Sequence, residues 1–322
     1  MNEGKISILT IGDISVDQFL KINESDASLN CDINREHCKI SFKYGEKIPV
    51  ERYHFTFGGS ALNTAVGFSR LGFETSIASI TGIGKDADET LYFLEKENVK
   101  VDSCIKEGES NRSSIILLKG ERTIFSYHAP RDYSKLKLPN APWIYFASAA
   151  KGSDLLVPQV LDQIASGTKL VFNPGSWQLT NFEKFLPLVK GAIALILNKS
   201  EANMVIGEAT PREQLKKMLA LGARIAVITD GINGAYAASR DKFVHSSILA
   251  GQTIDSTGAG DSFACALISG LIYKQSLEEG LRWGMINSGS VVEKIGANEG
   301  LMKAGEIEAE LAKTKNLKII EI

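Results

Sequence analysis

The sequence predicts an α/β fold built around a mainly parallel sheet. Short runs of aliphatic and β-branched residues recur along the 322-residue chain, and segments with helical spacing separate them. This alternation is typical of βαβ units, whose strands are covered on both faces and so read as continuous apolar runs. No internal repeat, low-complexity tract or Gly/Ser linker interrupts the chain. We therefore expect a single domain over residues 1–322.

The predicted strands of the parallel sheet are the apolar runs at 6–11, 144–146, 170–172, 193–197 and 225–229. Between them, apolar residues recur at helical spacing in 155–164 and 215–221.

Two stretches break this rhythm and predict a separate β-sheet lid, with segments at about 18–57 and 104–128. Within the second stretch, 113–118 and 123–127 flank a four-residue turn, 119–122, that contains glycine. This pattern is a β-hairpin signal. The alternative is an ordinary hairpin at the edge of the main sheet.

Charge and hydropathy exclude several classes of partner. The chain has 36 basic and 38 acidic residues and a net charge of −2, whereas binding to a nucleic acid usually shows as a basic surplus. No stretch approaches the length of a membrane span. The apolar run at 6–11 is too short for a signal peptide. We expect a cytoplasmic protein that binds neither nucleic acid nor membrane.

The four cysteines are too few for a disulfide framework in so long a chain. We therefore expect reduced thiols at Cys31, Cys38, Cys104 and Cys265. His37 lies between the first two and raises a metal site as the alternative. That spacing matches no common zinc pattern, and a fourth ligand is missing nearby.

A glycine-rich segment precedes an apolar helix near residue 260. Gly258, Ala259 and Gly260 lie where the helix begins, and Asp261 falls in its first turn. Free amides and the positive end of the helix dipole make such a start an anion site. Asp261 could simply complement the dipole. It could equally deprotonate a hydroxyl while a phosphoryl group is held beside it.

A second glycine-led helix start lies at 58–72, with Asn63 near its first turn and Gly72 as a plausible C-cap. Two other glycine patterns are misleading. Residues 82–85 lack the remaining positions of a Walker phosphate loop. The segment at 258–263 lacks the last glycine of a dinucleotide fingerprint, so the sequence gives no support for a nicotinamide dehydrogenase.

Together these motifs resemble the ribokinase-like (PfkB) family of carbohydrate and nucleoside kinases. The resemblance covers nearly the whole chain, because five motifs occur in the family's order: 12–17, 58–63 with 70–72, 198–201, 229–234 and 255–263. It implies a three-layer α/β/α sandwich with a small β-sheet lid.

The resemblance also implies transfer of the γ-phosphoryl group of ATP to a hydroxyl. Asp261 is then the catalytic base, and the amides of Gly258, Ala259 and Gly260 hold the developing charge. Phosphoryl transfer needs this kind of positioning and charge stabilisation more than it needs covalent chemistry.

Five residues match positions that line the family's sugar pocket. Asp17 resembles the acceptor of sugar hydroxyls, and Asp13 and Ser15 share its loop. Gly59 and Asn63 belong to the second helix start. An amide such as that of Asn63 both donates and accepts, as recognition of a hydroxyl requires.

Asn198 and Glu201 resemble the pair that orders Mg²⁺ and its waters around the phosphates. Mg²⁺ uses few protein ligands and keeps several waters, so a contact through water is expected. The alternative is a capping box, with Asn198 as N-cap and Glu201 at the third helical position.

Thr229, Gly231 and Gly234 resemble the family's nucleotide loop, although Asp230 departs from the hydrophobic or basic residue expected there. The alternative is a plain strand–turn–strand in which both glycines are turn residues.

The loop that contains Gly296 and Ala297 resembles the one beside adenine. In some relatives this loop and the stretch with Asp255 and Thr257 hold a monovalent cation, so K⁺ is a further expected cofactor beside ATP and Mg²⁺.

The leading functional prediction is an ATP-dependent kinase for a primary hydroxyl of a small sugar such as ribose, fructose or a keto-sugar. A nucleoside kinase is the alternative, with a base stacked on Phe19, Tyr44, Phe55 or Phe57. A non-catalytic nucleotide or sugar sensor is disfavoured, because the Asp261 motif is intact.

Two further expectations concern the lid. Arg122 and Arg131 bracket the end of the lid region, and either could reach a substrate anion or a phosphate, including that of a sugar that already carries phosphate. The alternative is an isolated, solvated surface arginine. Lids of two copies could pair into a homodimer, since an exposed sheet edge needs a cover.

Overall fold

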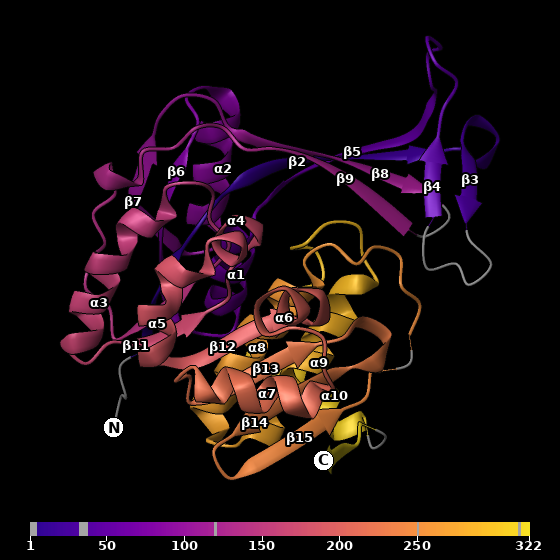
Figure 1. The fold of residues 1–322 in the computed structure, drawn as a ribbon. Coiled ribbons are helices and arrows are strands. Elements are labelled where there is room, and N and C mark those ends of the chain that lie inside the picture. Colours follow the sequence, from indigo (N-terminus) through magenta and orange to yellow (C-terminus); the bar gives the residue numbers. More distant parts are fainter. Residues whose placement is uncertain (1–4, 32–37, 119–120, 250, 315–316) are drawn as a thin grey trace.

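The computed structural model describes residues 5–31, 38–118, 121–249, 251–314 and 317–322 (Figure 1). In this part of the chain, ten strands form the main sheet in the order β16-β15-β14-β13-β12-β11-β10-β1-β6-β7. Neighbours from β7 to β13 are parallel, and β13 to β16 pair antiparallel. The strand bounds are β1 Ser7–Ile11, β6 Glu74–Thr81, β7 Val99–Lys106, β10 Trp143–Phe146, β11 Lys169–Phe172, β12 Ala192–Asn198, β13 Ile225–Thr229, β14 Ala235–Ser239, β15 Lys242–Ser246 and β16 Ile319–Glu321.

Helices cover both faces of the main sheet and create two hydrophobic cores. One core joins the sheet to α1, α2, α8, α9 and α10, and the other joins it to α3, α4, α5, α6 and α7. The alternation of strand side chains feeds both cores: Ile8 points into the first and Leu9 into the second. The predicted three-layer sandwich is confirmed. The helix bounds are α1 Ser60–Arg70, α2 Lys85–Lys96, α3 Val157–Ala165, α4 Ser176–Thr180, α5 Leu186–Gly191, α6 Lys199–Ile206, α7 Pro211–Ala220, α8 Ala259–Lys274, α9 Leu277–Val292 and α10 Ala304–Lys313.

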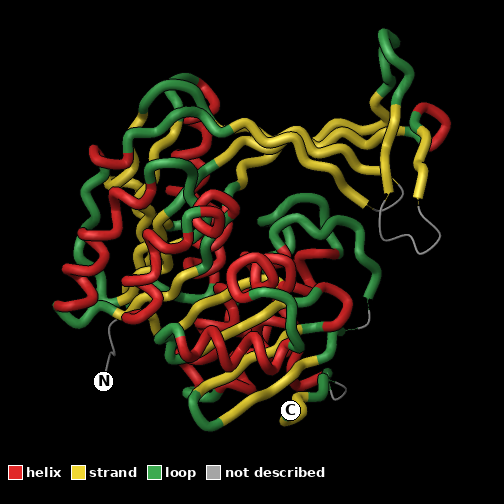
Figure 2. The backbone as a smooth tube through the Cα atoms, in the orientation of Figure 1, coloured by secondary structure: helices red, strands yellow, loops and turns green. Residues whose placement is uncertain are grey.

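A second sheet extends away from the main body (Figure 2). Its strand order is β5-β2-β8-β9, with β2 Ser15–Ile22, β5 Val50–Gly58, β8 Asn111–Leu118 and β9 Glu121–Tyr127. The predicted boundary at 18 therefore falls inside β2. The boundary at 104 falls inside β7 of the main sheet. Each of these strands continues across the residue at which the sequence composition changes. The composition change therefore does not coincide with the end of the strand.

The predicted hairpin corresponds to β8 and β9, but its turn is shorter than predicted. Glu121 and Arg122 already pair with Leu118 and Leu117 as the first residues of β9. The other two turn residues, 119 and 120, lie outside the described residues. β9 begins two residues earlier than predicted, because its pairing with β8 continues to Leu118, the last residue of β8.

A two-stranded ladder of β3 (Ser28–Cys31) and β4 (Cys38–Ser41) lies beyond the far end of the second sheet (Figure 1). A disulfide joins Cys31 to Cys38, so the expectation of reduced thiols is wrong for these two. The antiparallel register places them directly opposite each other, a proximity that sequence spacing did not reveal. His37 lies outside the described residues. Cys104 and Cys265 are free.

No helix in the described residues is both long and apolar enough to cross a membrane.

Candidate active site

Two neighbouring pockets share Ser60, Ser148 and Asp261. The first, of about 240 Å³, lies where β10, β11, β12 and β13 end, and we call it the strand-end pocket. The second, of about 250 Å³, is lined largely by β2, β8 and β9, and we call it the second-sheet pocket. Pockets at the carboxyl ends of parallel strands are the usual ligand sites of open α/β sheets.

Asp261 lies in the first turn of α8, and its position depends on an unusual backbone at the N-cap. Gly258 is left-handed, with a φ of 77°. A Cβ there would lie 2.4 Å from Cβ of Ala297. Glycine alone meets both demands. The first amides of a helix lack partners within the helix, so the start of α8 offers donors to an anion beside the Asp261 carboxylate.

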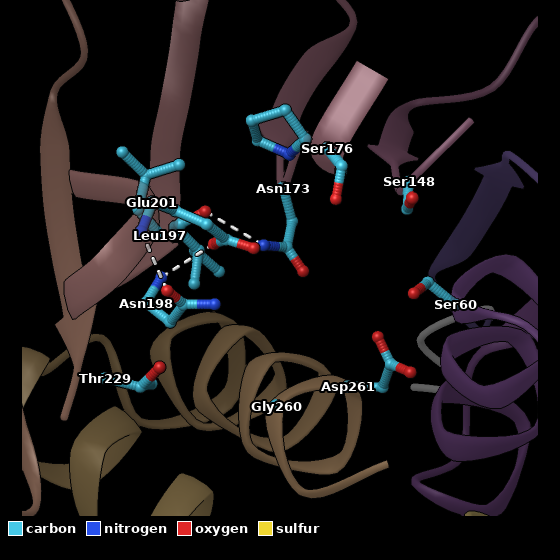
Figure 3. Close-up of a pocket in the computed structure, with 13 residues that line it drawn as sticks. Ser60, Ser148, Asn173, Ser176, Leu197, Asn198, Glu201, Thr229, Gly260 and Asp261 are labelled. Carbon is cyan, nitrogen blue, oxygen red and sulfur yellow. Dashed lines mark hydrogen bonds between the residues drawn. The ribbon is translucent and has the colours of Figure 1, made fainter. Parts of the chain in front are cut away.

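The Asp261 carboxyl is buried and held by two neighbours. Asn63 Nδ2 donates to its Oδ2 at 2.8 Å, and Ser60 also donates to it. Burial raises the pKa of Asp261, while the bonds from Asn63 and Ser60 oppose that rise. A carboxylate with a raised pKa is a stronger base, as proton abstraction requires. In Figure 3, Asp261 and Ser60 lie across the strand-end pocket from Asn198 and Glu201.

The second-sheet pocket has an acidic end. Ser15 Oγ donates to Oδ1 of Asp17 at 2.8 Å, and Ser113 donates to the same carboxyl. Burial raises the pKa of Asp17. The buried carboxyl of Asp13 accepts from the Tyr133 hydroxyl, and burial raises its pKa too. Both carboxyls line this pocket, because Asp13 lies between β1 and β2 and Asp17 lies near the start of β2.

Two residues of α1 and its N-cap complete this end. Oδ1 of Asn63 is buried, and the described residues offer it no hydrogen-bond partner. An orphaned buried acceptor is costly unless a ligand supplies the donor. Gly59 has a φ of 91°, and a Cβ there would lie 2.6 Å from the Asp13 carbonyl oxygen. Gly59 thus allows the β2 loop and α1 to approach closely.

Asn198 and Glu201 form the capping box that the sequence offered as the alternative. Oδ1 of Asn198 accepts from the Glu201 amide at 2.9 Å, and Oε2 of Glu201 accepts from the Asn198 amide at 2.8 Å. Both residues still line the strand-end pocket. Burial raises the pKa of Glu201, and the nearby Asp261 charge adds to that rise. Capping therefore fixes these side chains at the pocket rather than removing them from it.

The three residues of the predicted nucleotide loop separate in the structure. Thr229, at the end of β13, lines the strand-end pocket. Gly231 begins a short 3-10 turn, Gly231–Asn233, between β13 and β14, and Gly234 follows it; neither glycine lines either pocket. A Cβ at Gly234 would lie 1.9 Å from the Ser246 carbonyl oxygen. The turn geometry explains both glycines.

Asp255, Thr257, Gly296 and Ala297 build the wall behind the start of α8. Oδ1 of Asp255 accepts from the amide and the hydroxyl of Thr257, at 2.9 and 2.7 Å. Oδ2 accepts from the Gly296 amide at 3.0 Å. The buried carboxylate thus ties two loops together, and Ala297 packs against Gly258. Of this set, Thr257 lines the second-sheet pocket.

Several pocket residues were not predicted. Ser148 follows the end of β10 after one residue, Asn173 follows β11 directly, and Ser176 begins α4. Polar residues placed just after predicted strands were an available signal, because such ends meet at one edge of the sheet. Tyr133 and His128 beside Asp13 carried no comparable signal.

The two arginines of the predicted lid differ. Arg131 donates to the carbonyl oxygens of Glu107 and Glu109, at 2.8 and 2.7 Å, and so braces the loop before β8. Arg122 lines the second-sheet pocket instead.

Comparison with known proteins agrees with this geometry. The model of the pfkB family of carbohydrate kinases matches residues 25–304, and the chain belongs to this family. An ATP-dependent 6-phosphofructokinase of Thermoanaerobacterium thermosaccharolyticum is 25% identical over 314 residues, 92% of this chain and 91% of that protein. A ribokinase of Haemophilus influenzae is 26% identical over 295 residues, 84% and 92% of the two chains.

A solved nucleoside kinase of Methanocaldococcus jannaschii, an archaeal member of the ribokinase family, has the same fold. Its TM-score is 0.77 at 21% identity, over 96% of this chain and 99% of that one. The protein is therefore a phosphotransferase with an alcohol group as acceptor, within the sugar and nucleoside kinases of the PfkB family.

Proposed function

We propose that this enzyme transfers the γ-phosphoryl group of ATP to a primary hydroxyl of a small sugar. One observation carries the proposal: the buried Asp261 carboxyl belongs to both pockets. A residue in that position faces a phosphoryl donor on one side and a hydroxyl acceptor on the other. The 6-phosphofructokinase relative, which is ATP-dependent, supports the choice of donor.

In this proposal the nucleotide phosphates occupy the strand-end pocket and the sugar occupies the second-sheet pocket. Asp261 takes the proton as the acceptor oxygen bonds to the γ-phosphorus, and ADP leaves with the bond electrons. The amides of Gly258, Ala259 and Gly260 stabilise the charge on the transferred group. Asn63 orients the base through its bond to Asp261 and offers its free Oδ1 to the sugar.

The donor set of the strand-end pocket fits Mg²⁺. Oxygens of Glu201 and Asn198 face that pocket, and such oxygens suit a cation that keeps most of its waters. Bound there, Mg²⁺ would neutralise phosphate charge. The Asp255 and Thr257 side chains already satisfy each other, so a K⁺ site beside them would use backbone carbonyls.

The pocket favours a sugar over a nucleoside. Of the four aromatics considered for base stacking, Phe19 is buried and Tyr44 fully exposed, and Phe57 packs on Phe55 and Phe93. None of these four lines the second-sheet pocket; the rings that do are Tyr127, whose hydroxyl donates to Glu109 at 2.6 Å, and His128, beside Ile115 and Ile124.

We propose that the second sheet acts as a lid that excludes water from the transfer, within a single catalytic domain. Its edge strand β9 exposes Phe125 and Tyr127. A homodimer that covers this edge is our proposal for the assembly, and light scattering coupled to size exclusion measures it.

ADP release across sugars, sugar phosphates and nucleosides, with and without K⁺, tests the function. Replacing Asp261 by Asn should lower kcat by about 10²–10⁴-fold, the contribution of a positioned general base, with ATP binding largely retained. Asp241, exposed in the β14–β15 turn, provides the matched Asp→Asn control. Turnover by D261N close to that of wild type would contradict the assignment.

A further inference from the structure

We propose that the acceptor sugar carries an anionic group, a carboxylate or a phosphate, and that Arg122 binds it at the end of the second-sheet pocket opposite Asp17. This inference rests on the proposed function and names the substrate class of the same site.

The face of the second sheet toward the pocket changes character along the strands. Directly paired residues of neighbouring strands share a face, and the face repeats every second residue. Successive rows on this face are therefore polar, then apolar, then basic at the far end. They contain Asp17, Ser113 and Ser126; then Phe19, Ile115 and Ile124; then Lys21, Leu117 and Arg122.

Arg122 lies at a useful distance from the acidic end. Arg122 lies four positions along β9 from Ser126, which pairs with Ser113 beside Asp17. At about 3.3 Å per residue this is about 13 Å along β9. An arginine side chain that leans back into the pocket leaves room between the charges for one monosaccharide skeleton. Ile115 and Ile124 line the middle of that space.

Arg122 also lacks the partners that other arginines have. Arg70 forms an ion pair with Glu97 at 2.7 Å, and Arg112 pairs with Asp86 at 2.5 Å. Arg131 donates to the backbone. Nε of both Arg131 and Arg122 is buried without a hydrogen-bond partner, but for Arg122 no hydrogen bond or ion pair joins the rest of the guanidinium to another described residue.

A buried cationic donor without a partner is costly, and a ligand that supplies the acceptor removes the cost. The planar guanidinium fork matches a carboxylate or a phosphate bidentately. A neutral sugar or a nucleoside could offer a single hydroxyl acceptor, but neither a counter-charge nor the bidentate fit of an anion. Arg112 also lines this pocket, but Asp86 pairs with it. The pocket thus has carboxylates at the hydroxyl end and an unpaired cation at the other, the polarity expected for an acceptor with one charged end.

Kinetics of the full-length enzyme with ATP and Mg²⁺ test the inference. Fructose, fructose 6-phosphate and 2-keto-3-deoxygluconate are a neutral, a phosphorylated and a carboxylated acceptor, each with a primary hydroxyl. We expect kcat/KM for one of the two anions to exceed that for fructose at least 100-fold. R122M should reduce this preference at least tenfold, mainly through a higher KM for the anionic acceptor. R122K should fall between R122M and wild type.

Arg52 is the matched control, because it pairs with Lys21 in the basic row, is exposed and lines neither pocket. R52M should keep the wild-type preference. Thermal melting shows whether R122M is folded, and R122K keeps the test usable if it is not. The inference is wrong if fructose matches the better anion, or if the Arg122 variants leave the preference intact or lower all three rates equally.

Calorimetry separates this inference from the proposed function. If no acceptor is phosphorylated, the function fails, but Arg122-dependent binding of fructose 6-phosphate or 2-keto-3-deoxygluconate would still support the anion site. If the wild type binds neither more tightly than fructose, the anion site fails.

Discussion

The strand-end pocket and the second-sheet pocket meet at Asp261 but are built differently. The first consists of residues just after parallel strands and at the starts of α6 and α8, where backbone conformation decides the geometry. The second consists largely of alternate side chains along β2, β8 and β9. The contrast implies that phosphoryl-transfer chemistry depends on a few glycines, whereas acceptor choice can change by side-chain replacement without refolding.

Gly258→Ala is the strongest test of the strand-end pocket, whose geometry depends on backbone conformation. The added Cβ would meet Ala297 at 2.4 Å in a left-handed conformation, so the start of α8 must move. We expect kcat to fall by about 10²–10³-fold, the effect of misplacing an anion-hole donor. Gly305→Ala in α10, where a Cβ meets nothing within 4 Å, is the control and should be neutral. Steady-state kinetics decide; an active G258A would contradict the backbone-based account.

Asp17→Ala tests the second-sheet pocket. Its effect should be smaller and should fall on the KM for the acceptor rather than on kcat. Loss of a charged hydrogen bond costs about 1.5–3 kcal/mol, so the KM for the acceptor should rise about 10–100-fold. The KM for ATP should stay near wild type, because Asp17 does not line the strand-end pocket. Initial-rate measurements in both substrates separate the two constants. A selective change in the KM for ATP would undo the division between the pockets.

The smallest expected effect is a shift in pH dependence, where the two halves share Asp261. Burial raises the pKa of Asp261. As pH is lowered, kcat should therefore begin to fall at a higher pH than for an ordinary Asp, whose pKa is about 3.9. The Asn63 amide lowers this pKa, and Asn63→Leu should move the acid limb to higher pH. Profiles of kcat at saturating substrates measure both. An unmoved limb in N63L would exclude Asp261 as the titrating base.

The same group predicts how stability depends on pH. Because folding raises the pKa of Asp261, the native state binds more protons than the unfolded one, and stability falls as pH rises. The loss occurs as pH rises from the unfolded-state pKa, about 3.9, through the higher native-state pKa of Asp261. At higher pH the buried carboxylate destabilises the wild type relative to D261N. Melting temperatures of the two proteins should therefore diverge from pH 4 to pH 7.

The sequence predicted the layered fold and the core of the site, because both follow local rules. The apolar run at 170–172 became β11, and the spacing after Gly260 became α8. Glycines before α1 and α8 marked the two helix starts that form the Asn63–Asp261 hydrogen bond, across 198 residues.

What the sequence did not reveal depends on long-range pairing. The row of Asp17, Ser113 and Ser126 exists only because β2 pairs in parallel with β8. The Cys31–Cys38 disulfide likewise depends on the register of β3 and β4. Local composition carries no record of such registers, since a shift by one residue turns each side chain to the opposite face.

The two ends of the second-sheet pocket lie at different distances from the base of the second sheet. Asp17 lies two residues from the start of β2, about 7 Å, while Arg122 lies about 20 Å out, opposite Leu117 near the end of β8. A rotation of about 10° at the base would move Asp17 by about 1 Å and Arg122 by about 3.5 Å. If the second sheet closes over the acceptor as we propose, hydroxyl recognition near the pivot would survive an opening that breaks the contact at the far end, and the Arg122 contact would be the last to form.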